Sequence, residues 1–167
     1  MVPVLGLVSV AQAQNPPAAQ ASPPACTAPE HRQFDFWIGD WDVSIKGRKV
    51  GENRITLEEG GCLIHEHWKA IQGGGTGQSF NFFDRTDGKW HQVWVSNTGT
   101  VLDLAGDFRD GKLAFKGLTR QPNGGEVLHE LTFSQNPDST VRQHWQTSAD
   151  SGKTWQVIWD GLYRRAR

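Results

Sequence analysis

From His31 to the C-terminus, apolar and polar residues alternate with a period of two over short stretches, and each stretch ends in a Gly, Asn or Asp turn signal. Only the segment from His31 to Ile38 favours a single helical turn. The pattern predicts strands near residues 41–47, 50–58, 61–71, 77–84, 89–96, 100–108, 112–119, 126–134, 140–148 and 154–164. About ten sequential strands joined by hairpins predict an all-β, antiparallel up-and-down barrel, because closure of the sheet removes its exposed edges.

The chain before residue 31 has a different composition. Residues 1–13 hold a short apolar run followed by Ala11-Gln12-Ala13, which has the small-x-small form of a signal-peptidase site, although the usual basic start of a signal peptide is missing. Residues 14–30 are rich in Pro and Ala without an apolar period, which predicts a disordered linker. We therefore expect a periplasmic or secreted protein with one barrel domain over residues 31–167.

Export makes the two cysteines informative. An oxidising compartment favours a disulfide between Cys26 and Cys62, the only cysteines of the chain, which would join the N-terminal segment to the barrel. The chain-entropy model assigns about 4 kcal/mol to such a closure. The alternative is a pair of free thiols, with Cys62 buried as a small hydrophobic residue.

The overall charge excludes two classes of partner. A formal charge of -1, with acidic and basic residues interspersed, provides no basic face for a nucleic acid and no attraction to a membrane surface. The chain has eight Trp, one Tyr and nineteen Gly, which suits a sheet with many tight turns. The oligomeric state stays open.

A Glu or Gln stands two residues before a Trp in three of the predicted strands. The pairs are Glu66 and Trp68, Gln92 and Trp94, and Gln143 and Trp145. Because residues i and i+2 of a strand point to the same side of the sheet, each polar side chain shares a face with its Trp. Three strands would then direct an amide or carboxylate and an indole into one space, which is typical of a ligand cavity.

If the Trp side chains point into the barrel, the alternation along each strand decides which other side chains also point inward. The predicted ligand-binding residues are Asn53, Glu66, Trp68, Ser79, Asn81, Phe83, Trp90, Gln92, Trp94, Gln143 and Trp145. Leu57 would share this inner face. Buried amides cost a few kcal/mol each unless they are satisfied, so this wall needs internal water or a polar ligand. We expect a small polar-aromatic or polyhydroxylated ligand; the alternative is a filled barrel with a structural or partner-binding role.

Glu66 is the one carboxylate that parity places among these aromatic residues. Desolvation would raise its pKa and make it a candidate catalytic acid or base, with amides such as Gln92 holding a carbonyl or hydroxyl group. An isomerase or lyase is therefore a second candidate function. A single carboxylate does not support the paired-carboxylate mechanism of most glycosidases. The structural alternative is Glu66 as a hydrogen-bond hub.

Histidines raise the question of a metal. His65 and His67 share one strand face, and His91 and His144 could lie on the same surface. With Trp68 inward, these histidines point outward into solvent. An inverted register would place them in the cavity, where they could bind zinc, copper or haem iron. With the Trp face inward, we expect no metal and no cofactor.

Two local motifs carry a resemblance to a known family. The segment FDFWIGDWDV (residues 34–43) places Gly-x-Trp at the first strand, and the chain ends in Gly161-Leu162-Tyr163-Arg164 before Arg165. Together with Gly61-Cys62 and the Glu/Gln-x-Trp steps, this resembles a family of exported bacterial lipocalin-like (calycin-type) domains, over roughly residues 30–167. The resemblance implies an up-and-down barrel whose first-strand Trp packs beneath a C-terminal Arg, and it implies no particular activity.

Residues 148–155 match the Asp-box pattern Ser-x-Asp-x-Gly-x-Thr-Trp. The pattern specifies a turn: Ser148 and Asp150 can accept hydrogen bonds from backbone N–H groups, Gly152 permits a left-handed backbone, and Trp155 would pack under the hairpin. Sialidase propellers repeat this box. One copy in a chain this short argues against a propeller.

Overall fold

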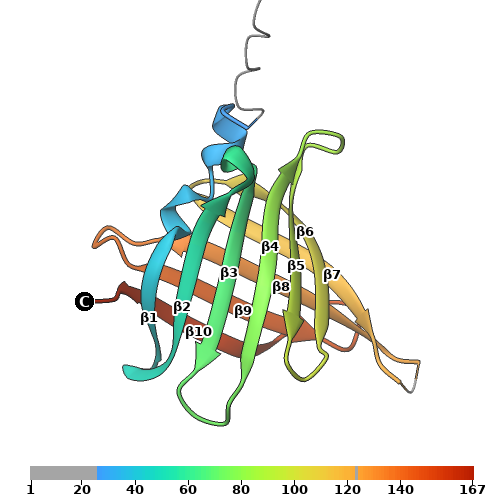
Figure 1. The fold of residues 1–167 in the computed structure, drawn as a ribbon. Coiled ribbons are helices and arrows are strands. Elements are labelled where there is room, and N and C mark those ends of the chain that lie inside the picture. Colours follow the sequence, from blue (N-terminus) through green and yellow to red (C-terminus); the bar gives the residue numbers. More distant parts are fainter. Residues whose placement is uncertain (1–25, 123) are drawn as a thin grey trace, which may run out of the picture.

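The computed structural model describes residues 26–122 and 124–167, and they form a closed antiparallel β-barrel (Figure 1). The strands are β1 (Gly39–Ile45), β2 (Arg48–Glu58), β3 (Leu63–Ala70), β4 (Thr76–Asp84), β5 (Lys89–Ser96), β6 (Val101–Arg109), β7 (Lys112–Arg120), β8 (Glu126–Gln135), β9 (Val141–Ser148) and β10 (Gln156–Arg165). Each strand pairs with its neighbours in sequence, and β1 pairs with β10 to close the barrel. The predicted fold class is confirmed.

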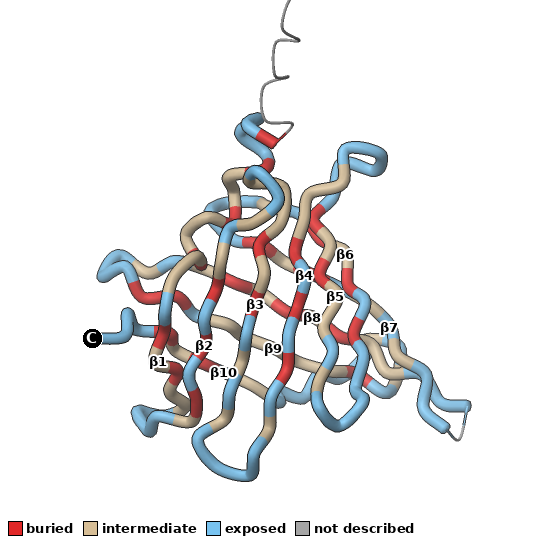
Figure 2. Tube along the Cα trace, viewed as in Figure 1, coloured by how far each residue is buried: buried red, intermediate tan, exposed pale blue. Residues whose placement is uncertain are grey.

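Short turns set the strand register. Lys46 and Gly47 connect β1 to β2, and Asp110 and Gly111 connect β6 to β7; all four have positive φ angles. Two consecutive left-handed residues match the right-handed twist of the flanking strands, which is why Gly is favoured in such hairpins. Buried and exposed positions alternate along the strands, as Figure 2 shows. Leu57 was predicted to point inward but is 41 % exposed, because it lies near the end of β2 beside a rim turn.

The described residues contain three short 3₁₀ helices: η1 (Pro29–Arg32) and η2 (Asp35–Trp37) precede β1, and η3 (Glu59–Gly61) joins β2 to β3. The single predicted helical turn is therefore two 3₁₀ helices, η1 and η2. Together η1 and η2 cover one end of the barrel (Figure 1, blue). Among the described residues, no helix is long and apolar enough to cross a membrane.

The covered end holds the apolar core. Phe34 and Trp37, beside and within η2, are both 0 % exposed. Their rings lie 4.9 Å and 4.6 Å, between centroids, from that of Phe133 on β8, and Phe34 also packs edge-on against Trp90. Aromatic rings bury large areas and prefer such tilted contacts. The segment before β1 thus closes this end of the barrel with its own side chains.

Trp41 and Arg165 join the first strand to the last. The Arg165 guanidinium lies 4.0 Å from the ring centroid of Trp41, and its Nη1 donates a hydrogen bond to the carbonyl oxygen of Ile38 at 2.7 Å. Gly39 makes room for this arginine, since a Cβ atom there would lie 1.6 Å from Nη1. The arrangement expected of the first-strand Trp and the C-terminal Arg is present.

Cys26 and Cys62 form a disulfide, so the prediction of a bridge is confirmed and the free-thiol alternative is wrong. The bond ties Cys26, three residues before η1 begins, to the residue after η3, across a sequence separation of 36. The predicted signal-like segment, residues 1–13, and most of the linker at 14–30 lie outside the described residues. At the end of that linker range, Pro29 and Glu30 belong to η1.

The hairpin between β9 and β10 has the hydrogen bonds that its sequence predicts. Ser148 Oγ accepts from the backbone N–H of Gly152 at 2.8 Å, and Asp150 Oδ1 accepts from that of Thr154 at 2.9 Å. Hydrogen bonding, first from the Thr154 hydroxyl, lowers the pKa of Asp150 to about 2. Trp155 is 37 % exposed, so it covers the hairpin less than expected; it stands just before β10 begins.

Candidate functional site

The inward face of the barrel carries a layer of buried polar side chains. Glu66 on β3 is only 4 % exposed, and the buried members of the layer are Asn53, Glu66, Ser79, Asn81 and Gln92. They come from β2, β3, β4 and β5, which are hydrogen-bonded neighbours. Parity therefore assigned the inner face of these strands correctly.

Glu66 accepts two hydrogen bonds from neighbouring strands. Asn53 Nδ2 on β2 donates to Glu66 Oε1 at 2.7 Å, and Ser79 Oγ on β4 donates to Glu66 Oε2 at 2.5 Å. Ser79 stands directly opposite Glu66 in the β3–β4 register. The carboxyl group is thus positioned by side chains on both sides of its own strand.

A directed chain of hydrogen bonds extends from Glu66 across β4 to β5. Gln92 Nε2 donates to Asn81 Oδ1 at 2.7 Å, and Asn81 Nδ2 donates to Ser79 Oγ at 2.8 Å, which in turn donates to Glu66. Each donor in this chain is oriented toward the carboxyl group. The network fixes the amides of Asn81 and Gln92 and leaves Gln92 Oε1 without a partner in the described part of the chain.

Tyr163 and Gln143 extend the polar layer on the opposite side. Tyr163 Oη on β10 donates to Gln143 Oε1 on β9 and lies 3.5 Å from Asn53 Nδ2. No described residue accepts a hydrogen bond from Gln143 Nε2. Asn53 Oδ1 is also unpartnered among the described residues, although Asn53 is only 2 % exposed.

Burial dominates the electrostatics of this layer. Loss of solvent raises the pKa of Glu66 to about 7, although hydrogen bonds from Ser79 and Asn53 act in the opposite direction. Burial, followed by the charge of Glu66, raises the pKa of Tyr163 well above its usual value. Tyr163 is therefore neutral at physiological pH, whereas Glu66 can exchange a proton there.

A cavity of about 190 Å³ lies on one side of the polar layer. Aromatic, apolar and polar side chains all contribute to its wall. It is lined by Glu66, Trp68, Gln92, Trp94, Leu102, Leu131, Gln143, Trp145, Trp159 and Tyr163. Its four Trp side chains are only partly buried, unlike the fully covered Trp37 and Trp41 of the core. The three Glu/Gln-x-Trp pairs therefore line one cavity.

Two glycines let indole rings lie against the barrel wall. A Cβ atom on Gly51 would lie 2.1, 2.6 and 2.6 Å from Cη2, Cζ2 and Cζ3 of Trp68, and one on Gly77 would lie 2.1 and 2.3 Å from Cζ2 and Cη2 of Trp94. Near-equal distances to adjacent ring atoms place each glycine over the face of the ring, not at its edge. One face of each indole thus covers backbone, and the other is turned away from the wall.

Not every predicted residue reaches the cavity. Phe83 and Trp90 lie toward the closed end instead, where Phe83 contacts His31 edge-on and Trp90 Nε1 donates to Gln33 Oε1 at 3.1 Å. They share the inner face but stand at a different height along the barrel. Three further predicted residues do not line the cavity but belong to the hydrogen-bond network of Glu66. Asn53 and Ser79 donate to the carboxyl group directly, and Asn81 donates to Ser79.

Sequence patterns missed several cavity residues. Trp159 and Tyr163 on β10, together with Leu102 and Leu131, were not predicted. The alternation Trp159-x-Gly161-x-Tyr163 could have revealed the first two, since all three positions share one face. His129 was also overlooked: its Nδ1 accepts a hydrogen bond from Trp145 Nε1 at 3.1 Å. These contacts come from strands without the Glu/Gln-x-Trp step.

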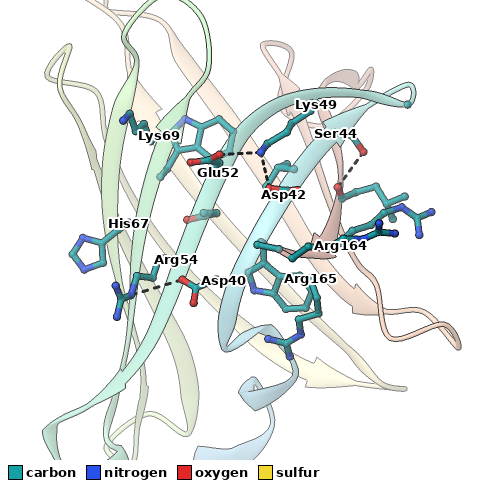
Figure 3. A pocket seen from close by; sticks show the side chains of 18 residues that line it. Asp40, Asp42, Ser44, Lys49, Glu52, Arg54, His67, Lys69, Arg164 and Arg165 are labelled. Carbon is teal, nitrogen blue, oxygen red and sulfur yellow. Dashed lines mark hydrogen bonds and ion pairs between the residues drawn. The ribbon is translucent and has the colours of Figure 1, made fainter.

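A second, more open hollow of about 880 Å³ involves β1, β2 and the C-terminal residues. Figure 3 shows its charged side chains: Lys49 Nζ lies 2.7 Å from Asp42 Oδ1 and 2.9 Å from Glu52 Oε1. Exposed ion pairs of this kind contribute about 0–1 kcal/mol each. Six Lys and Arg side chains but only three Asp and Glu side chains line the hollow, so its charge is basic overall. Its charged side chains are largely exposed to solvent, which screens them, so this hollow is a weaker candidate for a small-molecule site than the cavity.

His65 and His67 on β3 lie on the outer face, as the inward orientation of Trp68 predicts. His65 Nδ1 lies 3.3 Å from Glu58 Oε1, and the ring centroids of His65 and His67 are 3.9 Å apart. Donor atoms of Glu58, His65 and His67 all fall within 4.8 Å of one another, so this exterior cluster could hold a metal ion. Asp84, Asp87 and His91 form a similar group.

No protein-family model matches the chain, and no curated protein matches it either. The resemblance to exported lipocalin-like domains stays a prediction. What bears on function is the cavity and the polar layer beneath it.

Proposed function

We propose that this protein is an exported barrel that binds a small molecule in the cavity above Glu66. The observation that supports this most is the composition of one wall: four partly buried indoles beside Glu66, Gln92 and Gln143. Among these four indoles only Trp68 and Trp159 contact each other, with ring centroids 5.5 Å apart, whereas Phe34 and Trp37 at the closed end are fully buried. An open space of about 190 Å³ argues for an occupant.

The size of the cavity limits the ligand. An apolar cavity of about 150 Å³ accommodates benzene, and drug-sized ligands need about 300 Å³ or more. A space of about 190 Å³ therefore suits a molecule with one ring or a short branched chain. Gln92 Oε1 offers an acceptor and Gln143 Nε2 a donor, so the ligand should carry one or two polar groups on a frame of that size.

Two features support export to the periplasm or beyond. The Cys26–Cys62 disulfide is of the kind that persists in oxidising compartments, and residues 1–13 have the composition of a signal segment. In a reducing compartment the bridge would be reduced and its stabilisation lost.

A fluorescence screen tests the proposal. Trp68, Trp94, Trp145 and Trp159 line the cavity, so a bound ligand should change indole emission, and calorimetry on each hit should give one site per chain. Trp94→Phe should weaken binding, whereas Trp155→Phe, a change at an exposed Trp outside the cavity, should not. Unchanged emission and no heat across one-ring aromatics, small polyols and small amines would contradict the proposal.

A second candidate function is favoured by the pKa of Glu66. A carboxyl group whose pKa lies at about 7, beside a cavity, can act as a general acid or base of an isomerase or lyase type. Glu66→Gln keeps the shape of the side chain and removes its proton exchange. Turnover of a bound hit that survives in Glu66→Gln would exclude this mechanism; turnover lost there and retained in Glu52→Gln, an exposed control on β2, would support it.

A further inference from the structure

The charge of the cavity wall has one sign. Of the ten residues that line it, only Glu66 and Tyr163 can ionise, and both ionise to an anion. Lys, Arg and His do not occur among the lining residues. A bound anion would therefore meet no opposite charge there, and burying an uncompensated charge is expensive. The electrostatics of the cavity reject anions and favour neutral molecules or cations.

The aromatic residues strengthen the preference for a cation. Trp68, Trp94, Trp145, Trp159 and Tyr163 supply five rings to one small space. The faces of aromatic rings carry the negative part of the ring quadrupole, and Trp attracts cations most strongly. Trp94 presses one face on Gly77 and contacts no other ring of the described residues, so its opposite face is left for a ligand. Trp68 presses one face on Gly51 and also packs against Trp159.

Hydrogen-bonding capacity separates a cation from a polyol. A polyol needs a partner for each hydroxyl group, whereas the internal network already occupies most of the polar atoms of this layer. Gln92 Oε1 and Gln143 Nε2 remain, and Leu102 and Leu131 add apolar surface. An alkylated ammonium group presents methyl groups instead of N–H donors, so it fits a wall rich in rings and poor in free acceptors.

We propose that the ligand is a small organic cation whose alkylated ammonium group lies among the indoles of Trp68, Trp94 and Trp145, with Glu66 as its counter-charge. This inference rests on the proposed small-molecule binding and names the chemical class of the ligand. The cavity of about 190 Å³ admits one such group and a short substituent.

The test compares two molecules of the same shape. Choline carries a trimethylammonium group, and 3,3-dimethylbutan-1-ol replaces it with an uncharged tert-butyl group. Calorimetry on the full chain at pH 8 should show choline binding at least about tenfold more tightly than the alcohol. Glu66→Gln should remove most of that preference, whereas Glu52→Gln, the same chemical change on the outer face of β2, should leave it intact.

A pH series gives an independent readout. The groups that face Glu66 from β2, β4 and β10 are Asn53, Ser79 and Tyr163, none of which titrates between pH 5 and 8; His65 lies on the opposite face of β3. Choline affinity should rise by up to about tenfold per pH unit up to about pH 7 and then level off, because the cation favours the ionised carboxylate. Affinity for the alcohol should not rise.

Each outcome decides between the two proposals. Equal or tighter binding of the alcohol overturns the cation inference and leaves small-molecule binding in place. Absence of choline binding, with neutral hits in the fluorescence screen, does the same. Absence of any ligand in both experiments overturns the proposed function as well.

Discussion

Trp90 and Trp94 stand four residues apart on β5 and face the same interior, yet they have different surroundings. Trp90 is covered by Phe34 and Phe83 and bonded to Gln33, whereas Trp94 lies partly exposed at the cavity wall. Gln92, between them, belongs to the polar layer. The closed end and the cavity end are thus built from the same residue types, and the polar layer marks where core ends and site begins.

The polar layer has two chemically different sides. Toward the closed end most of its groups are hydrogen-bonded to one another or to backbone, as when Asn81 Nδ2 donates to the carbonyl oxygen of Ile64 at 3.1 Å. Asn53 Oδ1 is an exception among the described residues. Toward the cavity Gln92 Oε1 and Gln143 Nε2 are free. Polar groups that are already hydrogen-bonded stabilise the fold, whereas unpaired polar groups can bind a ligand. The closed end and the cavity end of the barrel therefore differ in hydrogen bonding as well as in shape.

Replacing one Trp by Ala at each end of the barrel should show the largest difference between the closed end and the cavity end. Trp37→Ala should cost about 3–5 kcal/mol of unfolding free energy, because it leaves a void in a fully packed region. Trp94→Ala should cost less than half as much and abolish ligand binding. Urea unfolding and calorimetry measure the two effects. Equal destabilisation by both changes would show that the cavity end is also core.

The pH dependence of stability should depend on Glu66. Its folded-state pKa of about 7 exceeds the ordinary 4.5, so the folded protein holds the proton more tightly. The contribution of Glu66 to stability should therefore be largest below about pH 4.5 and fall by up to about 3 kcal/mol as the pH rises to about 7. Urea unfolding of wild type and Glu66→Gln over this range isolates the effect. A wild type that gains stability relative to Glu66→Gln across this window would refute the assignment.

Adding a methyl group between Trp94 and the barrel wall should test how this ring is packed. In Gly77→Ala the new Cβ would overlap the indole, which must then leave the wall, at a cost of about 1–3 kcal/mol. Ligand affinity should fall with it. Gly75→Ala is the matched control in the preceding hairpin, since its Cβ would meet nothing closer than 3.7 Å. Indistinguishable melting curves for the two variants would contradict the face-on packing of Trp94.

The smallest effect should come from one hydroxyl group. Tyr163→Phe removes the donor to Gln143 Oε1 and should cost about 1 kcal/mol, leaving the Gln143 amide free to rotate. The preference for choline over the uncharged alcohol should change more than the free energy of unfolding. Thermal unfolding and a repeat of the ligand comparison measure both. Val157→Ala, at an exposed position on the same strand, provides the control.

Period-two patterns predicted the ten strands and the inner face because both follow from local alternation. The same reasoning placed Glu66 in an aromatic, water-poor setting, where burial does raise its pKa. A separate argument, that the chain has only two cysteines and a signal-like segment, paired Cys26 with Cys62 correctly. These features depend on neighbours in sequence or on a choice between two alternatives.

The alternation pattern did not predict how far along the barrel axis each inward side chain lies. Parity assigns Trp90 and Trp94 to one face but does not show that η2 fills the space beside only one of them. Tyr163 meets Asn53 because closure brings β10 next to β1, a contact across 110 residues of sequence. Strand shear and closure, which set such contacts, leave little trace in local sequence.

The unpartnered Oδ1 of Asn53 has a consequence for how the polar layer tolerates acid. An ionised carboxylate only accepts hydrogen bonds, whereas a protonated one must also donate. Asn53 carries both a donor, now on Glu66 Oε1, and a spare acceptor. A rotation of this one amide would satisfy the new O–H group. The rotation would also move Nδ2 to the position where Oδ1 now has no described partner. The layer can therefore take up one proton, with the unpaired group changing from an acceptor to a donor.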